Sequence, residues 1–252
     1  HVVESGLVSV VGTTEPDHRI EVGMVGHEGM TGVGVVLGDD RSMNEALVQS
    51  TGTAWRIATP ALRQAMGASP ALTAALLRYI HVFIAQASQT ALANGRGKLD
   101  ERLARWLLMW HDRLRDDNLT ITHEFLALLL GVRRQGVTVA LHDLEGKGLI
   151  KSTRSLIKIL DRAGLQHAAN GFYGLPEAEY DRAIGLGSRR PRVARITPPR
   201  IRGTTARRGG RSRSGARHRR QRHRPCPLAD RVAAFRSRPG RPRRALREHE
   251  RC

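Results

Sequence analysis

Two arginines and a glutamine stand together at the point where one apolar helical pattern ends and another begins. Arg133, Arg134 and Gln135 follow Gly131 in the stretch LLLGVRRQGVTVALHDLEGKGLI, residues 128–150. A guanidinium donates hydrogen bonds in a fixed fork, and a carboxamide offers donors beside an acceptor. These groups match the polar edges of nucleic-acid bases and the oxygens of phosphates. The spacing alone is equally compatible with a solvated charged face on an ordinary helical hairpin.

The apolar residues around Gly131 predict two short helices that share one small core. We expect Gly131 to end the first helix in the left-handed conformation, so that the second leaves at a steep angle. The arginines then lie near the start of the second helix, facing away from its apolar stripe, where a helix can enter a major groove. The residues that recur at helical spacing are Leu126, Leu129 and Leu130 before the glycine and Val137, Leu141 and Leu144 after it.

The segments that flank these two helices predict a winged form of the helix-turn-helix. Residues 119–122 (LTIT) are strand-like, and Thr122 can cap the helix that follows. After Gly148, the stretch LIKSTRSLIKIL predicts two short strands that turn around residues 152–155. A solvated helical hairpin needs none of these additions, so their order favours DNA binding.

The upstream half of the chain predicts a strand domain followed by long helices. Residues 1–57 hold short alternating runs rich in Val, Gly and Thr, typical of antiparallel strands. Residues 100–114 predict an amphipathic helix that packs Trp106 and Trp110 in the core. A helix beginning at Ser69 carries an apolar seam that must pack against a second copy or another part of the chain, and we favour the dimer. The seam residues are Leu72, Leu76, Ile80, Phe83, Ile84, Ala87 and Ala91.

The strong positive charge is confined to the C-terminal tail. Of the 42 basic and 23 acidic residues, 23 arginines and three acids follow Ser188, so residues 1–187 hold 19 basic and 20 acidic side chains. The net charge of +19 is therefore no evidence that the folded part binds nucleic acid. The tail is too poor in apolar residues to fold alone. It is either an arginine-rich nucleic-acid arm or an extension that does not belong with residues 1–187. We favour the second interpretation because the tail has no lysine.

Several functional classes find no support in the sequence. Both cysteines lie in the tail, and no catalytic nucleophile, base and orienting residue can be assembled, so we expect no enzyme. No apolar run approaches a membrane span and no signal peptide opens the sequence, which favours a cytoplasmic protein. No metal-ligand spacing is found among His81, His111, His123, His142 and His167.

The order of a strand domain, a long helix, a further helix and a winged helix-turn-helix resembles the Crp/Fnr family of bacterial transcription regulators. The resemblance covers residues 1–187 and is most specific in ITHEFLALLLGVRRQGVTVALHDLEGKGLI. It implies an α+β fold with a partial antiparallel β-roll of the cyclic-nucleotide-binding type. We expect this roll over residues 1–68, a dimerisation helix over 69–97, a winged helix-turn-helix domain over 98–187 and a disordered Arg-rich tail over 188–252.

The resemblance also implies roles for single residues. Arg134 falls on the family's base-reading arginine, and we expect Gln135 and Thr138 to complete the base-reading set. Arg133 stands where a serine often caps the helix, so we expect this cap to be absent and Arg133 to contact a phosphate. Further phosphate candidates, with plain surface charge as the alternative, are Lys151, Arg154 and Lys158.

The strand domain departs from the family where other members bind a cyclic nucleotide. Val33 stands in place of a glutamate for the ribose, and Asn44 with Glu45 in place of an arginine–serine pair for the phosphate, which a glutamate would repel. Residues 41–42, an arginine and a serine, belong to the preceding turn. We therefore expect neither a cyclic nucleotide nor another cofactor. The family also has further strands ahead of this point, so we expect an open roll.

These features predict a homodimeric, sequence-specific DNA-binding regulator that reads a near-palindromic operator through the helix starting near Arg134. The alternative is a ligand-sensing or interaction module whose helix-turn-helix is vestigial. The expected partners are double-stranded DNA and a second copy of the chain, with RNA polymerase as a further candidate and no membrane.

Overall fold

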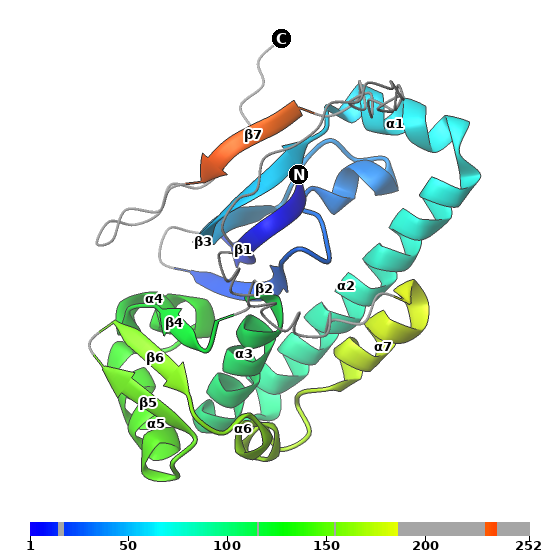
Figure 1. The fold of residues 1–252 in the computed structure, drawn as a ribbon. Coiled ribbons are helices and arrows are strands. Elements are labelled where there is room, and N and C mark those ends of the chain that lie inside the picture. Colours follow the sequence, from blue (N-terminus) through cyan, green and yellow to red (C-terminus); the bar gives the residue numbers. More distant parts are fainter. Residues whose placement is uncertain (15–17, 115, 154, 186–229, 236–252) are drawn as a thin grey trace, which may run out of the picture.

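The computed structural model describes residues 1–14, 18–114, 116–153, 155–185 and 230–235. An antiparallel sheet lies at one end, with β1 (Val2–Thr13) hydrogen-bonded between β2 (Arg19–Val25) and β3 (Asn44–Arg56) (Figure 1). A short 3-10 helix, η1 (Val33–Leu37), lies between β2 and β3 in the sequence. The predicted antiparallel strand domain is confirmed, with longer strands than the alternating runs indicated.

A fourth strand pairs with this sheet from the far end of the chain. β7 (Asp230–Phe235) runs antiparallel to the outer edge of β3. An exposed strand edge carries a row of unpaired peptide groups, and pairing with a further strand satisfies them. The prediction of a disordered tail did not include this strand. The remainder of that tail, residues 188–229 and 236–252, lies outside the described residues.

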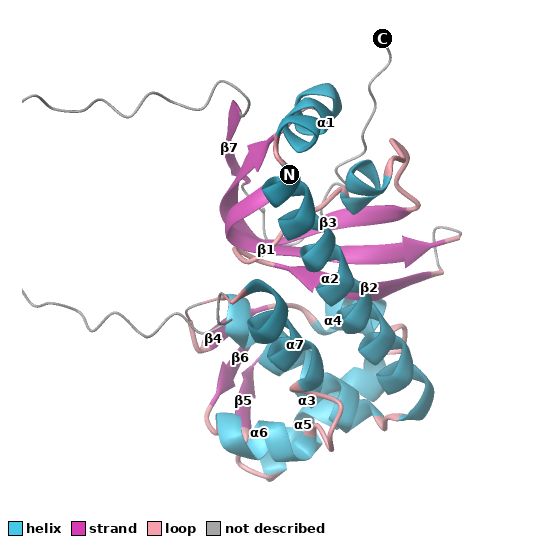
Figure 2. Ribbon diagram, turned by 90° about the vertical axis from the view of Figure 1, so that its right-hand side faces the viewer, coloured by secondary structure: helices cyan, strands magenta, loops and turns pink. Residues whose placement is uncertain are grey.

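Two helices connect the sheet to the rest of the molecule. α1 (Thr59–Ala68) ends at Ser69, whose hydroxyl caps α2 (Pro70–Arg96) by accepting from the Leu72 amide at 3.2 Å. α2 runs from the sheet towards the other end of the molecule, a rise of roughly 40 Å for its 27 residues (Figures 1 and 2). It contacts β2 and η1, with Phe83 packed on Gly23.

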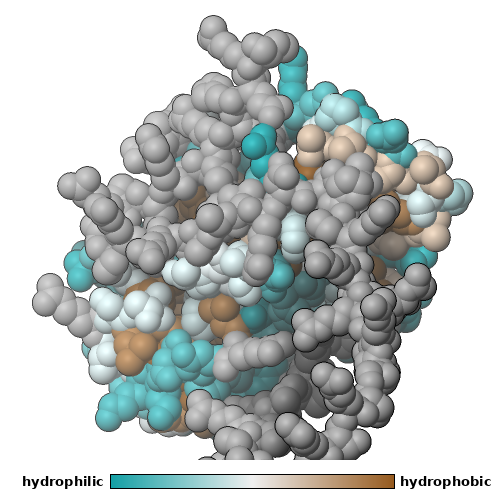
Figure 3. Space-filling view, turned by 45° about the horizontal axis from the view of Figure 1, so that its top comes forward, coloured by the Kyte–Doolittle hydropathy of each residue, from teal (hydrophilic) through white to brown (hydrophobic). Residues whose placement is uncertain are grey.

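Within the described residues, α2 alone is long and apolar enough to cross a membrane, which the sequence analysis did not expect. The same length and composition also occur in helices of soluble proteins, so they do not by themselves indicate a span. Exposed apolar side chains are also found elsewhere in the described residues, among them Leu37, Met43 and Leu175. On the face drawn in Figure 3, apolar residues form separate patches among polar ones.

The second unit is built around α3 (Leu99–Arg113). It contains α4 (His123–Leu130), α5 (Arg134–Gly146) and a three-stranded sheet ordered β4 (Asn118–Thr120), β6 (Leu156–Ile159), β5 (Ile150–Thr153). β5 and β6 form the hairpin predicted behind the second helix. This confirms the winged helix-turn-helix arrangement and, with the first sheet, the α+β fold class.

One apolar core continues through both units. Trp106 and Trp110 of α3 are buried, as predicted, in a cluster that reaches the helix-turn-helix and also includes Leu7, Met24 and Leu47 of the first sheet. α4 also packs against β2, where the side chain of Ile20 lies against Gly131. The position of the helix-turn-helix therefore depends on contacts with the strand unit.

The chain after the wing returns to α2. α6 (Arg162–Ala168) is capped by Asp161, and α7 (Leu175–Ile184) lies beside α2 (Figure 1). Tyr180 of α7 is buried, and its hydroxyl donates to the backbone oxygen of Glu28 at 2.8 Å. These residues were predicted to belong to the winged domain, but neither helix nor their return to α2 was predicted.

Candidate nucleic-acid interface

The turn between α4 and α5 has the geometry expected from its glycine. Gly131 adopts the left-handed conformation with φ of 63°, and the Val132 amide donates to the Ala127 oxygen at 2.9 Å. At the other end of α4, the Thr122 hydroxyl accepts from the Phe125 amide at 3.2 Å. Both predictions are confirmed. These local bonds fix where α4 begins and ends and therefore the direction in which α5 departs.

α5 divides cleanly into a buried and an exposed face. Arg133, Arg134 and Gln135 are exposed at its start, and Val139 follows on the outer side with 60% of its surface exposed. Because the opposite face anchors the helix in the core, the first turn is held out towards solvent. The residues of that buried face are Val137, Ala140, Leu141 and Leu144.

The first turn of α5 is linked to the first turn of α4 by polar contacts. The Arg134 Nε lies 3.0 Å from a carboxylate oxygen of Glu124, with both side chains mostly exposed. The Thr138 hydroxyl donates to the Arg134 backbone oxygen at 3.2 Å and lies 3.1 Å from the His123 Nδ1. Since these contacts occupy the Thr138 hydroxyl, its methyl group is the part left for a base. Neither the Glu124 nor the His123 contact was predicted from the sequence.

Arg133 occupies the cap position of α5, and its side chain makes no capping hydrogen bond. The expected absence of this cap is therefore confirmed. The Gly136 amide donates to the Arg133 oxygen at 3.0 Å, so the first two amide groups of the helix are the ones placed to donate to an outside acceptor, and a phosphate oxygen is a suitable one. The guanidinium of Arg133 is exposed beside them.

The wing places two cations opposite one another. Lys151 of β5 and Lys158 of β6 are directly paired in register, and both are exposed. Like charges in this position repel each other, and a bound anion relieves the repulsion. They are thus suitably placed for a phosphate backbone. Arg154, predicted at the turn between them, lies outside the described residues.

The seam predicted on α2 is divided between two faces of the helix. Ile80 is buried with Met30, Val36 and Leu62, and Leu76 packs against the same cluster. Phe83 packs against a second cluster in the strand unit, and Leu72 and Ala87 are half-buried. Of the seven residues assigned to the seam, only Ile84, with 57% of its surface accessible, and Ala91 are exposed. The structure therefore does not bring these seven residues together on one accessible face.

The positions compared with a cyclic-nucleotide site are engaged in local structure. Val33 opens η1, and Glu45 forms an ion pair with Arg19 across the sheet. The Arg41 amide donates to Asp39 at 3.0 Å, and the Ser42 hydroxyl donates to the Asn44 backbone oxygen at 2.8 Å. Among the described residues there is no cluster of three or more histidine, cysteine or acidic side chains suited to a metal ion.

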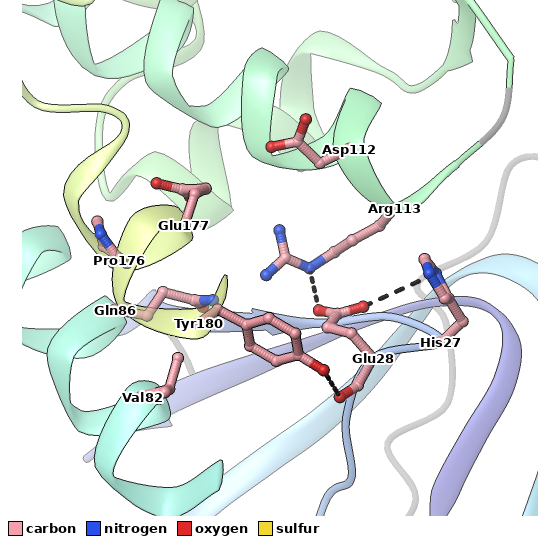
Figure 4. A pocket seen from close by; sticks show the side chains of 9 residues that line it. All are labelled: His27, Glu28, Val82, Gln86, Asp112, Arg113, Pro176, Glu177 and Tyr180. Atoms are coloured by element: carbon pink, nitrogen blue, oxygen red, sulfur yellow. Dashed lines mark hydrogen bonds and ion pairs between the residues drawn. The ribbon is translucent and has the colours of Figure 1, made fainter. Parts of the chain in front are cut away.

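A small pocket lies where the strand unit, α2, α3 and α7 meet (Figure 4). Arg113 pairs with Glu28 at 2.6 Å, and Tyr180 lies beside them, with its pKa raised to about 12 by burial. The space open to water is about 30 Å³, which suits one or two water molecules but not a nucleotide. The side chains that line the pocket therefore link the strand unit to α3 and α7.

A second buried polar group joins the strand unit to α3. The Glu21 carboxylate of β2 accepts hydrogen bonds from Ser9, from Gln49 at 3.1 Å and from the Trp106 indole at 3.0 Å. Burial raises the pKa of Glu21 to about 7, although these donors and the charges of Arg105 and Arg113 act in the opposite direction. The β2 strand was predicted, but its inward-facing acid was not singled out.

The comparisons with known proteins agree with this geometry. Residues 101–168 match the model of the Crp-like helix-turn-helix domain. The chain carries a Crp-like helix-turn-helix domain. The matched residues of this Crp-like domain run from α3 through the wing and include all of α4 and α5.

Solved structures extend the likeness to the strand unit. A transcriptional regulator of the Crp/Fnr family from Eubacterium rectale is 21% identical, covering 68% of this chain and 80% of its own, with a TM-score of 0.54. A Crp/Fnr regulator from Thermus thermophilus is 22% identical, covering 68% and 87%, with a TM-score of 0.53. No curated protein matches the sequence. The fold is that of the Crp/Fnr regulators, and the resemblance found in the sequence is confirmed.

Proposed function

We propose that the chain is a homodimeric transcription regulator that binds double-stranded DNA in a sequence-specific way. The observation that carries this proposal is the exposed first turn of α5, where Arg133, Arg134 and Gln135 project from a helix whose other face is buried. A helix held in this way can enter a major groove and present Arg134 to guanine and Gln135 to adenine. The paired lysines of the wing add phosphate contacts beside it.

The second copy would pair along the accessible face of α2. Leu77, Ile84 and Ala91 are exposed and follow one another at intervals of seven residues, and Leu92 adds to the same side. An apolar residue repeated every seven positions keeps facing one partner when two helices supercoil. The proposed seam is therefore rotated around the helix from the one predicted, because the predicted stripe packs largely on the chain's own strand unit.

The likeness to Crp/Fnr regulators favours a cytoplasmic regulator over an enzyme. A two-fold dimer places two copies of α5 on one side of the duplex. Such dimers read half-sites about one helical turn apart, so the preferred operator should be near-palindromic.

Selection of bound sequences from a random DNA pool tests the proposal directly. The whole chain is used, with competitor DNA at physiological salt, because the arginine-rich tail adds charge that can bind any duplex. We expect an enriched motif with two-fold symmetry. An enriched motif without symmetry would refute the dimer, and no enrichment would indicate that the helix-turn-helix is vestigial.

A further inference from the structure

We propose that Glu124 is a specificity residue of the DNA interface, which it serves by positioning the guanidinium of Arg134. The proposal rests on the proposed function, since it assumes that α5 reads DNA. Glu124 lies in the first turn of α4, and its carboxylate is 3.0 Å from Arg134 Nε. With 62% and 65% of their side-chain surfaces exposed, the two partners remain open to a DNA duplex.

The Arg134 atom that pairs with Glu124 determines which guanidinium nitrogens remain to donate to a base. A guanidinium has five N–H donors, one on Nε and four on the two terminal nitrogens. Guanine presents O6 and N7 in the major groove, and the two terminal nitrogens of an arginine can donate to both at once. A carboxylate held at Nε therefore leaves this terminal fork available and limits the directions in which it points.

The charge of Glu124 also affects binding to the wrong sequences. An unpaired arginine attracts any phosphate, which raises affinity for all DNA without distinguishing between sequences. A neighbouring carboxylate weakens that general attraction and repels the backbone. A duplex with guanine at the matching position gives Arg134 two directed hydrogen bonds, and these offset the weakened attraction to phosphates. Other sequences do not offer them. Glu124 thus lowers affinity for non-operator DNA more than affinity for the operator.

A simpler role for Glu124 makes a different prediction. Acids in the first turn of a helix stabilise that helix through its dipole, and Glu124 has such a position in α4. If this were its whole role, its removal would lower stability and leave the ratio of operator to non-operator affinity unchanged. The contact with Arg134 is what links Glu124 to base reading, so the test must separate these two effects.

The test compares Glu124→Gln with the whole wild-type chain, by fluorescence anisotropy on the selected operator and on a scrambled duplex. We expect non-operator affinity to rise about two- to fivefold, the range for an exposed ion pair, and the operator-to-scrambled ratio to fall by a similar factor. Glu124→Asp keeps the charge but is too short to hold Nε, so it should lose discrimination with little gain in non-operator affinity. Asp143→Asn is the matched control, because it removes an exposed charge from α5 about 13 Å along the helix from Arg134.

The double variant decides whether the effect passes through Arg134. In an Arg134→Ala background, Glu124→Gln should leave the discrimination ratio unchanged. An equal loss of discrimination in both backgrounds would overturn the proposal, as would an unchanged ratio in Glu124→Gln alone. A wild-type chain that selects no operator at all would instead refute the proposed function before this comparison begins.

Discussion

At the scale of single residues, the two arginines at the start of α5 should not behave alike. Arg134 is oriented by Glu124 and faces the groove, so Arg134→Lys, which keeps the charge and removes the fork, should cost about 1–3 kcal/mol on the preferred operator. Base preference should become flat at one base pair in each half-site. Affinity measured on operators with single base changes provides the check. Full preference in the lysine variant would mean that Arg134 acts only as a cation.

Arg133 provides the contrasting case at the neighbouring position. It stands at the cap of α5 beside amides suited to a phosphate, so Arg133→Ala should weaken operator and scrambled DNA by the same factor. The slope of log affinity against log salt should fall by roughly one for each phosphate that the variant no longer neutralises. A selective loss on the operator would assign base reading to Arg133.

Contacts between residues that are close in the sequence could be predicted. Contacts that depend on how two helices pack against each other could not. Gly131 and Thr122 act on peptide groups a few residues away, so their roles follow from local order. Glu124 and Arg134 are ten positions apart on different helices. Their contact depends on the angle between α4 and α5, which no local pattern defines. Glu21 was missed for the same reason, because its partners come from three other elements.

At the scale of elements, α2 shows how an apolar pattern can be detected without identifying what each part of it packs against. Its length and helical period were predictable, but the helix carries two neighbouring apolar stripes. One packs on the strand unit through Ile80 and Phe83, and the other remains accessible at Leu77 and Ile84. The period of the apolar residues indicates that one face of the helix is buried, but it does not identify what covers that face. The return of α7 onto α2 could not be predicted from the sequence either, since it depends on tertiary contacts around Tyr180.

The division of α2 gives a prediction that separates dimerisation from folding. Ile84→Asp should place an unpaired carboxylate between the two helices of the dimer and cost several kcal/mol of association. Sedimentation should then show a folded monomer. Ile80→Asp instead buries the charge inside the chain, so it should lower the free energy of unfolding itself. Met43→Asp, at a position 90% exposed on the strand unit, is the control and should leave the dimer intact. A dimeric Ile84→Asp variant would place the interface elsewhere.

At the scale of the whole molecule, the strand unit and the winged unit form one body with a titratable group at their junction. Leucines from the first sheet share a core with α3, and Glu21 hydrogen bonds to Trp106 at the same contact. The position of α5 therefore depends on a junction that contains a buried carboxyl group. Such a group favours its neutral form, because burial removes the water that stabilises its charge.

The pKa of Glu21 predicts how the stability of this junction varies with pH. It rises from an ordinary value of 4.5 to about 7 in the folded chain. The folded state therefore binds more protons than the unfolded state between these values, and stability falls as the pH rises. The contribution is fully present below pH 4.5 and is lost as the pH passes through 7, by about 3 kcal/mol in total.

Urea unfolding of the wild-type chain and of Glu21→Gln at a series of pH values measures this contribution. Glutamine keeps the size of the side chain and an oxygen that accepts from Trp106, but it does not titrate. Because both proteins share the same histidines, the difference between their two curves isolates Glu21. Between pH 5 and pH 8, we expect the unfolding free energy of the variant to decline less than that of the wild type. Above pH 7, the unfolding free energy of the variant should match or exceed that of the wild type. Parallel curves would show that Glu21 keeps an ordinary pKa, and the junction would then carry a permanent buried charge balanced by Arg105 and Arg113.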